Sequence, residues 1–208
     1  MGAFIAFVMA LAGCTSANPD PTNIDPGKTT TAVVTPSTTP AATPTPTPTK
    51  VYKPASASGP AENVPVPVLP AAAKEFSKKG LEEFARYWYS TLGYAYETGD
   101  MKPMMAITVA DCKTCARVKE NVENCYGSGG WIVGGQMTVH YSDSKFVLTP
   151  DGTYQAILMV QQAAVTSYLK DGKADVSLKA TIARADIVVA KYSDNRWTAL
   201  TAEHLTRD

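Results

Sequence analysis

The chain has 208 residues, a formal net charge of zero and a hydrophobic fraction of 45%. This length allows one large domain or two small ones, and the balanced charge without a basic stripe argues against nucleic acid as a partner. The composition divides the chain into a short apolar start, a tract rich in Pro, Thr and Ala over residues 15–70, and a globular part over residues 71–208.

The apolar start runs over residues 3–12 and ends at Leu11-Ala12-Gly13-Cys14. It is too short to span a bilayer, which takes about 20 residues, and it suits a signal peptide. The ending resembles the lipobox of bacterial lipoprotein signal peptides. That resemblance implies cleavage before Cys14, lipidation of its sulfur, and a lipid-anchored protein at the extracytoplasmic face of the cell membrane. No Lys or Arg precedes the run, which leaves open a start upstream of Met1.

The tract over residues 15–70 lacks hydrophobic periodicity and includes the alternating Thr-Pro segment 43–49. Proline removes backbone donors and favours extended conformations, so the tract cannot bury enough apolar surface to offset its ordering entropy. The composition therefore predicts a disordered tether that lifts the domain off the membrane. A plain spacer is the simpler interpretation, and O-linked glycosylation is the alternative.

Helical periodicity begins near Pro70, where a first turn is predicted before a break or bend at Gly80. An aromatic-rich stripe at three- and four-residue steps then predicts an amphipathic helix that ends at Gly99. A short helix capped by Asp100 follows, and Asp111 is predicted to cap a third helix from Cys112 to about Tyr126.

Cys112 and Cys115 form a Cys-x-x-Cys motif on the first turn of this third helix. A helix N-terminus stabilises a thiolate, so one interpretation is a redox site for thiol–disulfide exchange. A structural disulfide is favoured, because a thioredoxin-like motif follows a strand and this one lies between helices. Cys125 lies about 15 Å further along the helix and is predicted to be a buried free thiol. Neither a metal nor a cofactor is predicted, since no second Cys or His pair has ligand spacing.

The glycine-rich stretch 127–130 follows a helix and precedes a strand, which is the wrong order for a phosphate-binding loop, so it predicts a turn. Four strands are then predicted, at about 131–142, 153–169, 174–192 and 196–206. Turns containing Asp-Gly predict antiparallel hairpins between them. The Gly134-Gly135 pair predicts a bulge or bend in the first strand.

The segments Tyr94 to Asp100, Asp111 to Cys115 and Trp131 to Met137 resemble an uncharacterised family of actinobacterial lipoproteins with a nuclear transport factor 2-like (cystatin-like) cone. The resemblance implies an α+β fold in which N-terminal helices pack on a curved four-stranded antiparallel sheet over residues 71–208. It implies a pocket between the long helix and the sheet, and it brings no assigned activity. By analogy with other cones, a homodimer through the sheet is also considered.

Some cones are enzymes, and the polar residues considered for such a pocket are Tyr87, Tyr94, Tyr154, Asp186 and His204. No motif arranges them into a catalytic site. Arg184 and Asp186 interrupt an apolar strand and are interpreted as an outward face or a bulge. His140 and His204 are interpreted as surface or hydrogen-bonded strand residues.

The leading hypothesis is a non-enzymatic envelope lipoprotein, anchored through Cys14, whose cone binds an unidentified small molecule or envelope protein. A small hydrolase or isomerase in the same pocket and a Cys112–Cys115 redox lipoprotein are the alternatives.

Overall fold

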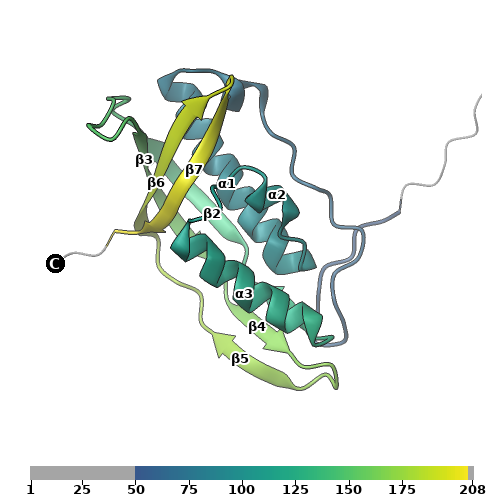
Figure 1. Cartoon of the computed structure of the whole chain (residues 1–208). Helices are drawn as coiled ribbons and strands as arrows, with labels where there is room; N and C mark the ends of the chain where they lie inside the picture. Colours follow the sequence, from purple (N-terminus) through teal and green to yellow (C-terminus); the bar gives the residue numbers. More distant parts are fainter. Residues whose placement is uncertain (1–49, 206–208) are drawn as a thin grey trace, which may run out of the picture. The chain divides into compact units, whose positions relative to one another are not determined.

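The computed structural model describes residues 50–205 (Figure 1). The predicted signal peptide, Cys14 and the tether up to residue 49 lie outside the described residues.

Residues 50–70, which the sequence analysis assigned to the tether, have a defined structure. Lys53 and Glu62 pair by two backbone hydrogen bonds, and Ser56 and Gly59 pair inside them at the tip of a hairpin. Trp131 donates its indole N–H to the Ser56 carbonyl at 2.8 Å. The ordered domain therefore extends at least to residue 50. Composition hides this, because the contacts that order the segment come from residues far along the chain.

The helical half begins with a 3-10 helix, η1 (Ala71–Lys74), and continues with α1 (Lys78–Thr98). Ser77 caps α1 by accepting the Gly80 N–H at 2.9 Å. The helix runs through Gly80 without the predicted break. A Cβ atom at this position would lie 2.0 Å from the Glu75 carbonyl oxygen, so the glycine allows η1 and α1 to meet closely. The apolar stripe of α1 is buried, as predicted, and comprises Leu81, Phe84, Ala85, Trp88, Leu92 and Ala95.

Two shorter helices follow, α2 (Lys102–Met105) and α3 (Lys113–Gly127). The predicted cap of α3 was Asp111, and this is wrong. Cys112 is the N-cap, and its sulfur accepts the Cys115 N–H at 3.3 Å. The disulfide holds this sulfur beside the first turn, where it replaces the carboxylate oxygen that usually caps a helix.

The sheet half of the described residues contains seven strands joined in two sheets, with orders β1-β4-β5 and β2-β3-β6-β7. All pairs are antiparallel. The predicted strand boundaries are close, but each of the first three predicted strands is divided by a bend into two. The strands are β1 (Trp131–Gly134), β2 (Met137–Asp143), β3 (Tyr154–Gln162), β4 (Val165–Tyr168), β5 (Ala174–Leu178), β6 (Arg184–Ser193) and β7 (Arg196–His204).

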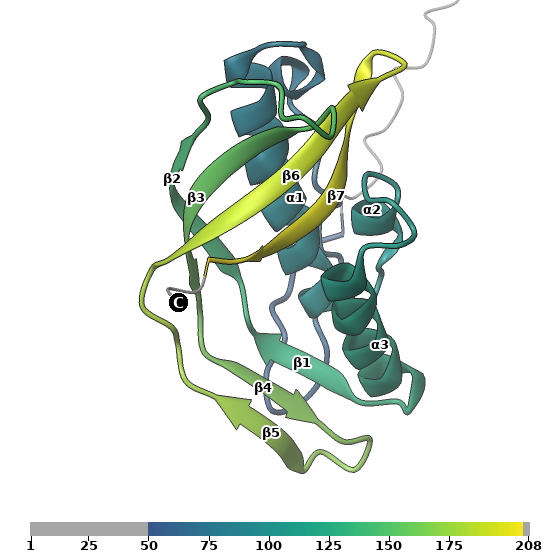
Figure 2. The same ribbon diagram turned by 60° about the vertical axis from the view of Figure 1, so that its left-hand side comes forward.

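The bends lie side by side, so the strands turn together. Gly134 and Gly135 have φ angles of 79° and 77°, which side chains disfavour. Gly135 donates its N–H to the Ala164 carbonyl at 3.0 Å, which joins the bend after β1 to the bend after β3. The predicted bend at the glycine pair is thus confirmed, and it curves the sheet around the helices (Figure 2).

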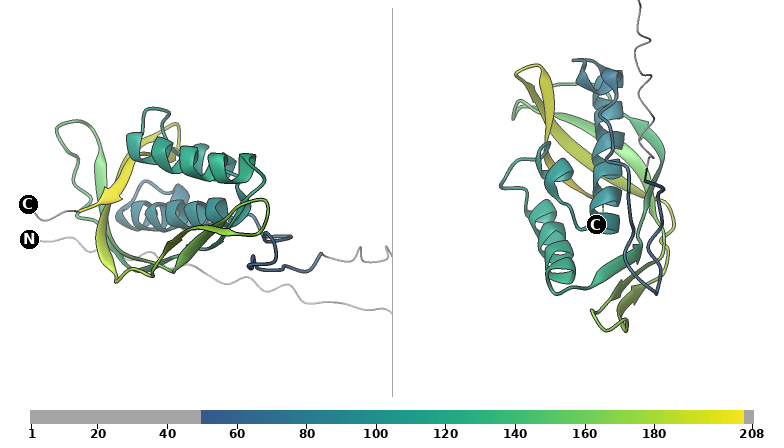
Figure 3. Two further views of the ribbon diagram at one scale, coloured as in Figure 1. Left: turned by 90° about the horizontal axis from the view of Figure 1, so that it is seen from below. Right: turned by 90° about the vertical axis from the view of Figure 1, so that its right-hand side faces the viewer.

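Helix α1 lies in the concave face of the curved sheet and packs on β1, β2 and β3 (Figure 2). Helix α3 runs beside α1 and packs on β7 and β1 (Figure 3). The domain is therefore an α+β fold with helices packed on a curved antiparallel sheet, as predicted. The space between α1, α3 and the sheet positions the candidate site.

Candidate functional site

A cavity of about 280 Å³ lies between α1, α3 and the strands of the four-stranded sheet, and we call it the Asp186 cavity. Most of its wall is apolar, and polar groups gather on the part formed by β6, β7 and the start of α3. The apolar lining comprises Trp88, Leu92, Val118, Met137, Val160 and Ala202. The polar lining comprises Tyr89, Tyr96, Thr114, Arg117, Gln162, Thr181, Asp186, Glu203 and His204.

Asp186 is a buried carboxylate at the wall of this cavity, with 2% of its surface exposed. The sequence interpretation of an outward-facing Asp186 is wrong. The alternation along β6 places Asp186 on the same face as Val188 and Ala190, both fully buried, so the aspartate faces the helices. Period-two alternation was present in the sequence, but both faces of the strand are partly apolar and the inner face could not be identified.

Both oxygens of Asp186 have partners. Tyr89 donates its hydroxyl to Oδ2 at 2.5 Å, and His204 Nδ1 pairs with Oδ1. Asp186 and His204 lie directly opposite each other in the β6–β7 register, while Tyr89 comes from the middle of α1. A buried carboxylate needs such partners, because an unpaired charge is costly away from water.

Burial and the neighbouring Asp186 charge raise the pKa of the Tyr89 phenol well above its usual value. Tyr89 therefore stays protonated at physiological pH and acts as a donor to the carboxylate.

His204 connects the buried carboxylate to the cavity. Its side chain is 61% exposed, and its Nδ1 is bound to Asp186. A neutral imidazole that donates from Nδ1 has a free lone pair on Nε2. The pair thus presents an oriented ring nitrogen in a cavity that Thr114 and Arg117 also line. It can accept a proton from a ligand or donate one to it.

A second cavity of about 490 Å³ lies between α3 and the strands β1, β4 and β5, and we call it the Cys125 cavity. Its apolar wall includes Val122, Ile132 and Val165, and its polar wall includes Asn121 and Asp175. Tyr96 and Gln162 line both cavities, so the two adjoin at these side chains.

The other polar candidates lie apart from this trio. Tyr87 donates its hydroxyl to the Pro67 carbonyl at 3.4 Å, and Tyr154 belongs to an aromatic cluster with Phe76, Phe146 and Trp197. Neither they nor Tyr94 line either cavity. His140 pairs with Gln161 at 2.9 Å on the exposed surface of the sheet. The structure thus brings together Asp186 and His204, and adds Tyr89, which the sequence analysis missed.

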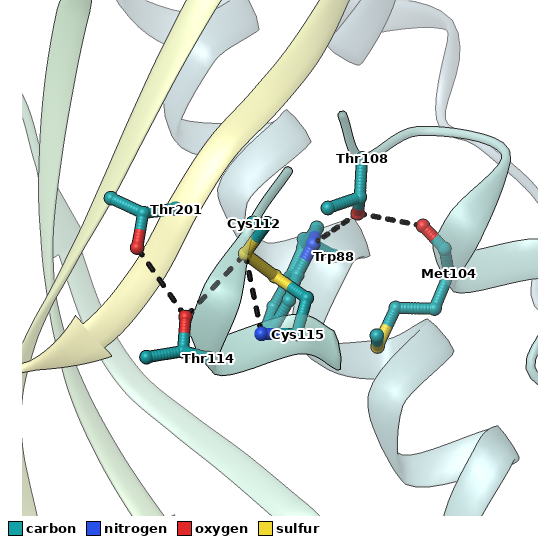
Figure 4. Close-up of a disulfide and its surroundings, with 7 residues drawn as sticks. All are labelled: Trp88, Met104, Thr108, Cys112, Thr114, Cys115 and Thr201. Atoms are coloured by element: carbon teal, nitrogen blue, oxygen red, sulfur yellow. Dashed lines mark hydrogen bonds between the residues drawn. A yellow bond between two sulfur atoms is a disulfide. The ribbon is translucent and has the colours of Figure 1, made fainter. Parts of the chain in front are cut away.

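Cys112 and Cys115 are joined by a disulfide at the start of α3 (Figure 4). They are 3% and 1% exposed, and Cys112 Sγ lies 3.4 Å from the Thr114 hydroxyl. Thiol–disulfide exchange requires a thiolate to reach a sulfur atom, so burial argues for a structural disulfide rather than a redox site. Cys125 is a free thiol at the wall of the cavity named after it, and burial raises its pKa.

Within residues 50–205, no group of three or more His, Cys, Asp and Glu side chains is arranged to hold a metal ion. None of the helices in this part of the chain is long and apolar enough to cross a membrane.

A protein-family model described as a family of unknown function, DUF6318, matches residues 50–203. No curated protein matches the chain. Among solved structures, the intermembrane space region of the chloroplast protein ARC6 is similar at 12% identity and a TM-score of 0.41, covering 63% of this chain and 98% of that one. Aln2 from a Streptomyces species is similar at 11% identity and a TM-score of 0.39, covering 62% and 93%. A protein of unknown function with a cystatin-like fold from Nostoc punctiforme is similar at 9% identity and a TM-score of 0.31, covering 61% and 89%.

Proposed function

The chain belongs to the family of unknown function DUF6318, and on this premise we propose that it is a lipid-anchored envelope protein whose domain binds a small molecule in the Asp186 cavity. The observation that carries the proposal is the trio of Tyr89, Asp186 and His204 on the wall of a largely apolar cavity. Small-molecule sites combine apolar walls with a few oriented polar groups.

A purely structural role explains the trio less well. An aliphatic residue at position 186 would fill the core without the cost of burying a carboxylate, and such replacements are often neutral or stabilising. The carboxylate instead orients a ring that borders the cavity, and ionisable groups in such surroundings are candidates for function.

The anchor is the second part of the proposal, and it rests on the sequence Leu11-Ala12-Gly13-Cys14. Lipidation of Cys14 would hold the protein at the outer face of the cell membrane, with the Pro-rich tract as spacer. We expect the protein in the membrane fraction and its Cys14→Ser variant in the soluble fraction. A Cys14→Ser variant that stays with the membrane would contradict the anchor and leave the binding proposal intact.

The binding proposal is tested by native mass spectrometry of the full chain carrying Cys14→Ser, after expression in a bacterial envelope. We expect a reproducible additional mass that dissociates on activation. An Asp186→Leu, His204→Leu double variant should lose this mass, whereas a His140→Leu variant on the outer sheet surface should retain it. The same additional mass on the double variant, or its absence from the parent chain, would overturn the proposal.

Acid–base catalysis is a second candidate function, because the free Nε2 of His204 is oriented by a buried carboxylate. A hydrolase would use this nitrogen to take a proton from an attacking water molecule. The Asp186→Asn variant tests this directly. The Asn side-chain oxygen can accept the Tyr89 hydroxyl and its amide N–H can donate to His204 Nδ1. The histidine proton then lies on Nε2, which can no longer accept a proton. With p-nitrophenyl acetate as probe, we expect hydrolysis that Asp186→Asn abolishes and His140→Gln preserves. Equal rates for all three proteins would reject catalysis of this class.

A further inference from the structure

We infer that the ligand of the Asp186 cavity is a single-chain amphiphile with a carboxylate head, and that its chain continues into the Cys125 cavity. This inference rests on the function proposed above, because it names the ligand class of that same site.

The first observation is the wall that the two cavities share. Tyr96 and Gln162 line both. Tyr96 is one turn beyond Leu92 on α1, and Gln162 ends β3 where the sheet bends. The cavities thus adjoin at these two side chains, and the inference requires that a change of side-chain rotamer there joins them.

The second observation is that apolar surface continues from one cavity to the other. Val118 and Val122, on successive turns of α3, line the Asp186 and Cys125 cavities respectively. Val160 in β3 lines the Asp186 cavity, and Val165 in β4, beyond the bend, lines the Cys125 cavity. Along α3 the lining runs from Thr114 to Asn124, about 15 Å at 1.5 Å per residue. A compact ligand would use one cavity, whereas an extended hydrocarbon chain covers the apolar surface of both.

The third observation concerns the polar end, where Arg117 and His204 line the Asp186 cavity. Within residues 50–205 Arg117 forms no ion pair, and His204 presents Nε2 while Nδ1 is bound to Asp186. The Arg117 guanidinium can donate charge-assisted hydrogen bonds to a carboxylate. Asp186 does not compete, because its oxygens are occupied by Tyr89 and His204.

The test measures binding of octanoate, dodecanoate and palmitate to the full chain carrying Cys14→Ser, by isothermal titration calorimetry below the micellar concentration of each. We expect affinity to rise at each step by about tenfold or more, since each longer chain buries additional methylenes. Arg117→Gln should weaken all three about tenfold.

Ser167→Phe separates the two cavities, because Ser167 lines the Cys125 cavity alone. This variant should weaken palmitate at least tenfold and leave octanoate unchanged. Thr166→Phe is the matched control on the opposite face of β4, and should change neither. Asn121→Trp, at the exposed rim of the same cavity, repeats the test without altering the sheet.

Three results would overturn the inference: no binding of any carboxylate, affinity independent of chain length, or palmitate binding unaffected by both Ser167→Phe and Asn121→Trp. Each of these leaves the proposed function standing if native mass spectrometry still finds a ligand that depends on Asp186 and His204. Absence of both the native ligand and carboxylate binding would reject the proposed function as well.

Discussion

At the scale of single residues, Asp186 is a buried carboxylate whose two oxygens both have hydrogen-bond partners. Replacing it with Ala would leave the Tyr89 hydroxyl buried without an acceptor. We expect Asp186→Ala to lower the free energy of unfolding by about 2 kcal/mol, within the usual cost of an unsatisfied buried group. Asp186→Asn keeps an acceptor for Tyr89 and should cost less than about 1 kcal/mol. Urea denaturation measures both, and equal costs would show that Tyr89 does not depend on this acceptor.

Tyr89 makes stability depend on alkaline pH. Its folded pKa is raised by burial and by Asp186, while the unfolded phenol ionises at about 10. The stabilising contribution is therefore complete below pH 10 and is lost as pH rises further, by about 1.4 kcal/mol per pH unit. Tyr89→Phe should flatten this decline, whereas Tyr141→Phe, at an exposed tyrosine, should not. Tyr126, with a pKa raised to about 12, contributes in the same direction.

The sequence indicated the members of the site better than their arrangement. Asp186 and His204 are among the polar residues that the sequence offers for a pocket, but their pairing depends on the register between β6 and β7, which no local pattern reveals. Tyr89 was missed because it lies 97 residues from Asp186 and beside the apolar stripe of α1 rather than within it. Its partner could be identified only after the sheet was folded over the helix.

At the scale of elements, helices and turns followed from the sequence, because periodicity, caps and Asp-Gly turns are local signals. The division of the first three predicted strands into pairs of shorter ones was foreseen only at the Gly134-Gly135 pair. The neighbouring strands bend at Ala163-Ala164 and at residues 179–183, which carry no glycine. Each bend is hydrogen-bonded to the strand beside it, Gly135 to the Ala164 carbonyl and Thr181 to the Gln162 carbonyl, and a sequence pattern does not contain these contacts.

The bend itself can be tested at Gly134. A Cβ atom there would lie 2.0 Å from the Ala164 carbonyl oxygen, and the φ angle of 79° also disfavours a side chain. Gly134→Ala should therefore cost more than about 3 kcal/mol, because conformational strain alone costs about 1–2 kcal/mol. Gly152→Ala is the matched control, since its φ is 73° and no atom lies within 4 Å. Similar melting temperatures for the two variants would show that the sheet can bend without Gly134.

At the scale of the whole molecule, the boundary between tether and domain was the least predictable feature. Proline remains frequent through residues 50–70, although threonine is absent there, and the segment is held by partners far along the chain. Tyr52 donates its hydroxyl to Glu97 at the end of α1, and Trp131 donates its indole N–H to Ser56 at the hairpin tip. These hydrogen bonds fix residues 50–70 against the rest of the domain. The family match also begins at residue 50.

These contacts predict that the hairpin is held in place by Trp131. Trp131→Phe keeps the aromatic stacking on Tyr168 and removes the hydrogen bond to Ser56. Because one neutral hydrogen bond contributes about 1 kcal/mol, local opening of the hairpin should increase about fivefold. Limited proteolysis with a Glu-specific protease after Glu62, which pairs with Lys53 in the hairpin, should then proceed faster in Trp131→Phe than in the parent chain, with the rest of the domain unchanged. Tyr141→Phe serves as control, and equal cleavage rates for Trp131→Phe and the parent would mean that other contacts hold the hairpin.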